Sequence, residues 1–415
     1  MADAPLPVME YPKLRPVEAF PVEAEGGETA VALRDPLNLS DGVLMVRAPA
    51  LFILQHFDGQ HSLLDIQAAF ARRFGQLLFT EQLAELIRTL DAHLMLESEH
   101  FHEARQRIEE AFRQAPVRPP IHAGKSYETA EERLRAQLAD YFTHAEGPGR
   151  PGAFQPTPPL RGAIIPHIDF LRGGFCYAWA YREIAERCDA DLFIILGTCH
   201  AATQTPFILT RKPYATPLGT LPTDLEAVAT IEERYPGDLY REEFAHRGEH
   251  SIEFQSVFLN YLYQGKRQVT VVPLLCGSFH EQVMAGRDPL DTPEVARMIG
   301  ALQALTARPD RRVCVLASVD LAHMGPRYGD AEPVTPDLLR WLAAEDRESL
   351  DAVVQVDARA FFRSVAKDQD RRKICGLSPI YTLLAVLEGG RGKLLKYAQW
   401  PDEQATVTFA STAFS

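Results

Sequence analysis

The stretch GAIIPHIDF at residues 162–170 decides the fold of this chain. Its apolar residues 163–165 fit a short buried strand, Pro166 ends that strand, and His167 follows where the chain leaves the sheet. Parallel sheets place their ligands at the carboxyl ends of strands, where the connecting loops converge. His167 is therefore predicted to be a site residue.

Two further apolar runs end in the same way. The run DLFIILG at residues 191–197 leads to Cys199 and His200, and the run RVCVLAS at residues 312–318 leads to Asp320. Each of the three strand ends thus carries a group that can bind a metal or move a proton. Their recurrence predicts one shared site.

The order of strands and helices predicts the fold class. Residues 269–275 form another nearly continuous apolar run, expected to be a central strand, whereas runs 393–399 and 406–414 are expected to be edge strands. Helical patterns alternate with these strands. We therefore expect an α/β domain over residues 161–415, with a mostly parallel central sheet flanked by helices.

Bulk composition excludes several classes of protein. The 415 residues are 46% hydrophobic and 24% charged, as in ordinary globular proteins. No apolar run approaches the roughly 18 residues of a membrane span, and the start MADAPLP lacks the pattern of a signal peptide. We therefore expect a cytoplasmic protein without membrane contact. A net charge of −13 argues against nucleic-acid binding, and six cysteines without CxxC pairs predict reduced thiols.

The first hundred residues predict a separate module. Residues 1–30 show no periodicity and are expected to form a flexible arm. Residues 31–100 predict three short helices, with Ser62 and Thr80 as N-caps, followed by a wing that opens at residues 94–96. This pattern resembles the winged-helix peptide-binding modules of the PqqD type.

Local charge indicates what this module binds. Residues 31–100 contain five basic and nine acidic side chains, a net charge of −4, which disfavours DNA. Docking of a peptide or a protein is therefore expected. Residues 101–160 predict connecting helices and linkers rich in proline and glycine.

Cys375 is a candidate metal ligand, because thiolate and imidazole are usual ligands of iron, copper and zinc. Ser378 and Pro379 predict a helix start just after it, and a thiolate is favoured near a helix N-terminus. The alternative is a buried structural thiol, which is common for a single cysteine.

Two further clusters predict acid–base groups. EHSIE at residues 249–253 places His250 and Glu253 three residues apart on one helix face, although a charged helix start would show the same pattern. SVDLAHMG at residues 318–325 places Asp320 three residues before His323, where a carboxylate can orient an imidazole. The alternative is a turn aspartate and a surface histidine.

As a set, these motifs resemble the Memo family. The resemblance begins near His122 and extends to the C-terminus. The matching pieces are HAG at 122–124 with Tyr127, IPH at 165–167, FIILG at 193–197 with His200, TPLG at 216–219, EHSIE, VP at 272–273, SVDLAHMG and ICG at 374–376.

The resemblance implies a fold similar to class III extradiol dioxygenases and LigB-like proteins, in which two histidines and a third ligand hold non-haem iron. Carried over by position, His167, His200 and Cys375 would be the metal ligands. Fe(II) is the first expectation, with copper next and zinc less favoured. The added N-terminal module is similar to that of bacterial forms of the AmmeMemoRadiSam system protein B type. These forms are thought to work with an AMMECR-type protein and a radical-SAM protein.

The chain departs from the family pattern in two places. The usual PHAGY is PHIDF here, so that Asp169 stands beside the site as a further ligand or as a partner of Arg172. The usual SHH is TCHA here, so that Cys199 replaces one histidine. A substrate contact could differ in consequence.

Three functional hypotheses follow. The first is an iron-dependent, dioxygenase-like oxidoreductase, with His250 or His323 as acid or base and Asp320 orienting His323. The second is a non-catalytic scaffold that sequesters copper or iron, and the third is a zinc hydrolase. In each, the pocket is completed by Asp169, Cys199, Glu249 and Glu253.

Overall fold

The computed structural model describes residues 9–23, 29–35, 39–40, 42–155 and 157–415. The chain forms two compact units, Met1–Ala115 and Pro116–Ser415. Among the described residues, no helix has both the length and the apolar content that a membrane span requires.

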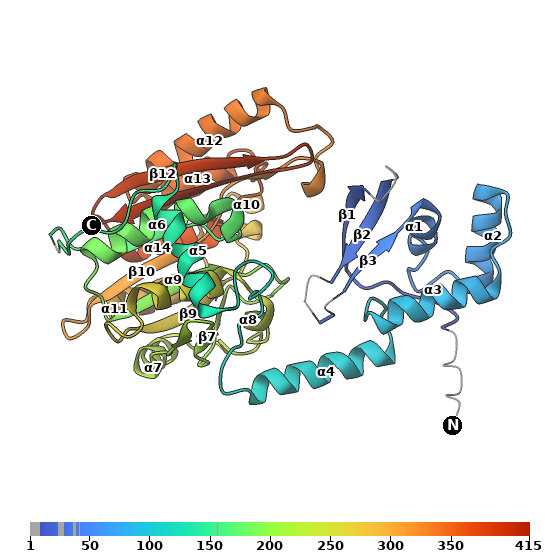
Figure 1. Cartoon of the computed structure of the whole chain (residues 1–415), viewed down its shortest axis with the longest axis horizontal. Helices are drawn as coiled ribbons and strands as arrows, with labels where there is room; N and C mark the ends of the chain where they lie inside the picture. Colours follow the sequence, from blue (N-terminus) through green and yellow to red (C-terminus); the bar gives the residue numbers. More distant parts are fainter. Residues whose placement is uncertain (1–8, 24–28, 36–38, 41, 156) are drawn as a thin grey trace. The chain divides into compact units, whose positions relative to one another are not determined.

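The N-terminal unit combines a three-stranded antiparallel sheet with helices (Figure 1). Its elements are β1 Glu18–Glu23, β2 Thr29–Arg34, β3 Val43–Val46, α1 Ala48–Leu54, α2 Leu63–Phe74, α3 Thr80–Ala92 and α4 Glu99–Gln114. Ser62 caps α2 as predicted and forms a capping box with Asp65, whereas the N-cap of α3 is Phe79 rather than Thr80. A core of its own, with Ile66, Leu83 and Leu90 fully buried, holds this unit together.

Two predictions for this unit need correction. Residues 18–23 of the predicted arm form a strand, and Arg15 is buried in an ion pair with Asp35. Residues 1–8 and 24–28 of that arm lie outside the described residues. Residues 94–96 do not open a hairpin or wing: they form a turn and one isolated bridge, between Leu96 and Leu14. The sheet of this unit instead precedes its helices.

The second unit is the predicted α/β domain. Its helices are α5 Glu131–Thr143, α6 Phe170–Arg187, α7 Leu225–Arg234, α8 Ala245–Gly248, α9 Ser251–Tyr263, α10 His280–Ala285, α11 Pro293–Thr306, α12 Pro336–Val354, α13 Ala358–Ala366 and α14 Leu377–Leu387. Its strands are β4 Gly162–Ile165, β5 Leu192–Thr198, β6 Phe207–Leu209, β7 Tyr214–Thr216, β8 Gly219–Leu221, β9 Thr270–Cys276, β10 Val313–Ser318, β11 His323–Met324, β12 Gly392–Pro401 and β13 Thr406–Phe414.

Four parallel strands form the centre of the main sheet. The strand order is β11-β13-β4-β10-β5-β9-β6, with β4, β10, β5 and β9 parallel and antiparallel strands on both sides of them. The fold class predicted from the sequence is thereby confirmed. The four parallel strands run the same way, so their carboxyl ends share one edge of the sheet.

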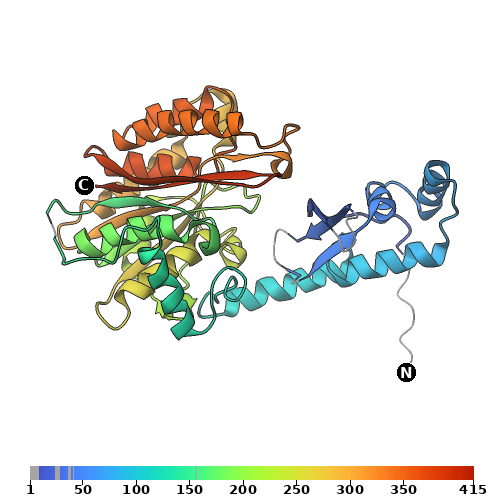
Figure 2. The same ribbon diagram turned by 45° about the horizontal axis from the view of Figure 1, so that its top comes forward.

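Helices cover both faces of this sheet (Figure 2). Alternate residues of β5 explain this arrangement, because successive side chains of a strand point to opposite faces. Leu192, Ile194 and Leu196 pack with α7, α11, α13 and α14, whereas Phe193 and Ile195 pack with α5, α6 and α9. Burial on both faces accounts for the unbroken apolar runs in the sequence.

The prediction of two edge strands at the C-terminus is only half right. β12 lies outside the main path and pairs with β13, but β13 lies between β11 and β4. All nine residues of β13 are buried. Two of its four polar side chains have partners inside the protein: Thr408 donates to Asp346, and Ser411 donates to the backbone carbonyl of Cys176.

Two glycines allow segments to approach closely at the carboxyl edge. A Cβ on Gly197, at the end of β5, would lie 2.6 Å from Ile252 in α9. A Cβ on Gly376 would lie 2.6 Å from the carbonyl oxygen of Asp320. The start of α9 and the Cys375 loop can therefore pack directly against the strand ends that carry the predicted site.

Candidate metal centre

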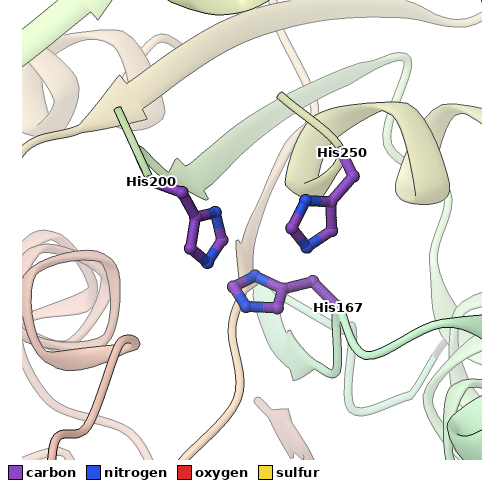
Figure 3. Close-up of side chains that lie close together, drawn as sticks. All are labelled: His167, His200 and His250. Atoms are coloured by element: carbon purple, nitrogen blue, oxygen red, sulfur yellow. The ribbon is translucent and has the colours of Figure 1, made fainter. Parts of the chain in front are cut away.

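Three histidines converge at the carboxyl edge of the sheet. His167 follows β4, His200 follows β5, and His250 is the N-cap of α9. Their ring centroids lie 4.9 Å (His167–His200), 5.0 Å (His167–His250) and 4.7 Å (His200–His250) apart. Figure 3 shows the three rings around a common space. One nitrogen of each ring lies within 4.8 Å of the others, so the cluster could hold a metal ion.

Each ring has a polar group close to its Nδ1 atom. His167 Nδ1 lies 3.0 Å from the carbonyl oxygen of Ser318, and His200 Nδ1 lies 3.0 Å from a carboxylate oxygen of Glu249. The other oxygen of Glu249 lies 3.3 Å from His250 Nδ1. Metal-binding histidines typically have such a partner on the second ring nitrogen, which fixes the tautomer and the ring orientation. The contacts leave Nε2 as the nitrogen of each ring that is available for coordination.

Cys375 supplies a fourth candidate donor. Its Sγ atom lies 3.2 Å from His167 Nε2 and 3.6 Å from the carbonyl oxygen of Asp320. The helix after it starts at Leu377 with Gly376 as N-cap, so the predicted cap at Ser378 is shifted by two residues. Burial raises the pKa of the Cys375 thiol, although His200 opposes this effect. The thiolate expected from the helix N-terminus is thus not the favoured form of the free side chain.

The pKa values of the three histidines are shifted in different directions. Burial lowers the pKa of His167 and of His250 well below the ordinary value of 6.5, so both rings are neutral near pH 7. Desolvation opposes the charge on His200 as well, but the Glu249 carboxylate raises its pKa well above 6.5. Burial likewise disfavours charge on Glu249, yet His200 and His250 hold the pKa of that carboxyl well below 4.5. Without a metal, His200 and Glu249 form an ion pair.

The residues present fit a metal ion. Ligand nitrogens at about 2.1 Å from a common ion are about 3–4 Å apart, so small ring rotations would bring the cluster to that separation. Imidazoles with occupied Nδ1 atoms, next to a thiol, are a donor set for iron, copper or zinc.

Asp320 and His323 differ from their expected relation. The Asp320 carboxylate accepts a hydrogen bond of 3.1 Å from the backbone N–H of His167 and lies 3.7 Å from His167 Nε2. Burial raises its pKa to about 6. His323 Nδ1 instead donates to the carbonyl oxygen of Leu321. Asp320 therefore contacts His167 rather than orienting the His323 ring.

Three other predicted pocket residues have different partners. Asp169 caps α6 and pairs with Arg172, which is the second of the two roles considered for it. Glu253 is fully buried in an ion pair with Arg118. Cys199 Sγ lies 3.7 Å from the carbonyl oxygen of Ala201, and burial raises the pKa of its thiol to about 12. These contacts give all three side chains partners other than the clustered histidines.

Sequence reasoning missed the segment behind His250. Arg118 donates to the carbonyl oxygens of His246 and Glu249. The ring of His122, uninformative by itself in the sequence, lies 5.6 Å from that of His250. Arg118 and His122 lie 126 or more positions before their partners in the segment 246–253. Nothing in their local sequence indicates the contact.

The fold and the site define a class: an α/β protein with a histidine cluster suited to a metal at the carboxyl ends of parallel strands. A family model described as "Memo-like protein" matches residues 118–413, and the chain belongs to this family. A MEMO1 family protein of Aquifex aeolicus is 26% identical over 96% of this chain and 99% of its own. Another, from Sulfolobus acidocaldarius, is 30% identical over 72% of this chain and 99% of its own.

A third relative, a MEMO1 family protein of Desulfurococcus amylolyticus, is 28% identical over 68% of this chain and 91% of its own. Among solved structures, an uncharacterized protein of Escherichia coli K12 aligns with a TM-score of 0.35 and 11% identity. That alignment covers 62% of this chain and 100% of the other, a likeness too slight to define the fold.

Proposed function

We propose that this chain binds reduced iron through His167, His200 and Cys375 and acts as a dioxygenase-like oxidoreductase. The observation that carries the proposal is the meeting of anchored imidazoles with a thiol 3.2 Å from His167 Nε2. Imidazole and thiolate together suit a redox-active metal better than magnesium or calcium, which prefer oxygen ligands.

The residues around the donors have separate roles in this proposal. Bound Fe(II) would supply redox chemistry at coordination positions that the protein leaves open. Glu249 and the Ser318 carbonyl hold the rings of His200 and His167. Asp320, whose pKa is raised to about 6, can exchange a proton beside His167 near neutral pH.

His250 has two roles open to it. Its ring belongs to the three-histidine cluster, so it can serve as a further ligand. Its pKa, lowered by burial, also keeps it neutral and able to accept a proton. His250→Ala separates these roles. If His250 is a ligand, the variant should bind the metal more weakly; if it only accepts a proton, metal binding should stay unchanged.

The proposal includes partners and a cellular setting. By resemblance, the chain would work in the cytoplasm with an AMMECR-type protein and a radical-SAM protein. Residues 31–100 would dock a peptide or a protein, which their net negative charge and separate core support. Co-purification of the full chain with each partner tests this part, and the absence of any retained partner would contradict it.

The metal is tested by elemental analysis of protein purified without oxygen. We expect stoichiometric iron in the wild type and a marked loss in Cys375→Ser. Cys199→Ser is the matched control, because this neighbouring thiol contacts Ala201 rather than the histidines. Wild-type protein without bound metal would refute the proposal.

A copper-holding scaffold is the second candidate, and the position of the Cys375 thiol favours it, because soft sulfur ligands select Cu(I). The scaffold would be supported if the wild type bound stoichiometric copper, if Asp320→Asn retained that copper, and if the protein consumed no oxygen. Stoichiometric zinc that is stable in air would instead support a hydrolase.

A further inference from the structure

The two candidate ligands beside His167 and His200 come from different segments, and a buried arginine lies behind each. His250 starts α9, whereas Cys375 ends the loop before α14. Arg118 has 0% exposure and Arg372 has 1%. Burying a guanidinium is costly unless its surroundings pair with it, so each arginine fixes the groups that it contacts, Arg118 through Nε and both Nη atoms and Arg372 through its Nη atoms alone.

Arg118 holds the segment that carries Glu249 and His250. Its Nε donates to the carbonyl oxygen of His246 at 3.0 Å, and its Nη2 donates to that of Glu249 at 2.7 Å. Its Nη1 pairs with the Glu253 carboxylate in the first turn of α9. One guanidinium thus joins the backbone just before His250 to the helix just after it.

Neighbouring residues complete this contact. The Glu253 carboxylate also accepts hydrogen bonds from the Tyr127 hydroxyl and from the backbone N–H of His122. His122 Nε2 lies 2.9 Å from the carbonyl oxygen of Gly248. The carbonyl oxygens of residues 246, 248 and 249 are therefore all held from residues 118–122.

Arg372 has the same relation to the Cys375 loop. Its Nη1 lies 2.8 Å from Asp346 Oδ1, and its Nη2 donates to Ser349 Oγ at 2.9 Å, both in α12. Its own carbonyl oxygen accepts from the backbone N–H of His323 at 2.7 Å. The next residue, Lys373, has a φ of 52°, a strained value for a side chain of this kind. Arg372 anchors the loop directly before this residue, and Asp370 Oδ1 accepts from the backbone N–H of Ile374 directly after it, at 2.9 Å.

We propose that Arg118 and Arg372 are positioning residues for two further ligands of a metal at His167 and His200, Arg118 for His250 and Arg372 for Cys375. This inference rests on the proposed metal binding at His167 and His200. A lysine keeps the charge of each arginine but cannot reproduce its planar fork of donors, so each lysine variant should release one ligand and spare the other.

The test uses Co(II) as the probe, added without oxygen to the full chain and to Arg118→Lys and Arg372→Lys. A sulfur-to-cobalt charge-transfer band reports the thiolate, and a paramagnetically shifted imidazole N–H signal reports His250. The variants Cys375→Ser and His250→Ala assign the two signals. We expect Arg372→Lys to lose most of the sulfur band and keep the His250 signal, and Arg118→Lys to show the reverse.

The two variants serve as matched controls for general destabilisation. Parallel loss of both signals in both variants, or no change in either, would overturn the proposal. A wild-type spectrum that lacks one of the two signals would also overturn it. Wild-type protein that takes up no Co(II) would instead refute the proposed metal binding itself.

Milder variants keep the test decisive if a lysine variant does not fold. His122→Phe keeps an aromatic ring but removes the contact with Gly248, and Tyr397→Phe removes the hydroxyl that donates to Asp346 at 3.0 Å. We expect the first to weaken only the His250 signal and the second only the sulfur band. The opposite pattern would overturn the assignment.

Discussion

The two sides of the metal centre are built differently. The imidazole side, defined as His200, Glu249 and His250, joins a strand end to a helix start through one carboxylate that contacts both rings. The thiol side, defined as Asp320, His323 and Cys375, includes a loop in which residues 369, 370 and 373 all have positive φ. His167 lies between them, with contacts to His200, His250 and Cys375.

This difference separates a preorganised side from a conformationally strained one. Rings whose Nδ1 atoms are already bonded need little rearrangement to accept a metal. A loop with several residues in the left-handed region keeps its shape only while its surroundings hold it. We therefore expect substitutions of the residues that anchor the ligands to cost more metal affinity on the imidazole side than on the thiol side.

Replacing His167 should have the largest effect, because this ring belongs to both sides. We expect His167→Ala to weaken metal binding by more than the roughly 10–100-fold typical of an outer partner. Competition with a chelator measures the affinity. His102→Ala, on α4 of the N-terminal unit, is the control. Stoichiometric metal retained by His167→Ala would mean that neither side is a metal site.

Glu249→Gln tests the imidazole side directly. The carboxylate accepts from both the backbone N–H and Nδ1 of His200, so its loss should weaken binding by about 10–100-fold. Asp320→Asn, on the thiol side, should have a smaller effect, since its hydrogen bond goes to the backbone of His167. Equal losses in the two variants would remove the proposed asymmetry.

The pH dependence of stability reports the packing behind the imidazole side. Burial lowers the pKa of His246 from 6.5 to about 3. The unfolded chain therefore binds one more proton between these values, and this stabilising contribution is lost progressively as the pH falls from 6.5 to about 3. His246→Gln removes this titration, so we expect the free energy of unfolding of the metal-free protein to change less steeply with pH than in the wild type. The expected difference in slope is about 1.4 kcal/mol per pH unit. Urea denaturation at pH 7 and pH 5 measures this, and identical slopes would contradict it.

The smallest effect is expected at Asp169, which lies next to the site without facing it. Asp169→Ala removes the N-cap of α6 and should cost about 1 kcal/mol of stability. Metal affinity should stay unchanged, because the carboxylate pairs with Arg172. A loss of metal in this variant would restore Asp169 as a ligand. Thermal unfolding and metal titration provide both measurements.

The sequence predicted the parts of the fold that depend on local pattern. The central strands are unbroken apolar runs because helices bury both of their faces. The prediction for β13 was wrong because its threonines and serine suggest an exposed face, whereas all of them are buried, and Thr408 and Ser411 pair with Asp346 and the Cys176 carbonyl. The strand at residues 18–23 was missed because it has no periodicity.

The same limit applies to the site. His167 and His200 were predicted because they directly follow apolar strands. The partnership of Glu249 with His200 spans 49 residues, and that of Arg118 with Glu249 spans 131. Such pairs depend on how the loops fold over the sheet edge. Motif spacing carries no information about them.

The most direct test of the central claim is anomalous diffraction from crystals of the protein purified without oxygen. Data collected above and below the iron absorption edge would locate the metal and identify it. We predict one peak between the rings of His167 and His200, within bonding distance of Cys375 Sγ. A metal-free cluster in wild-type crystals, or a metal bound elsewhere, would contradict it.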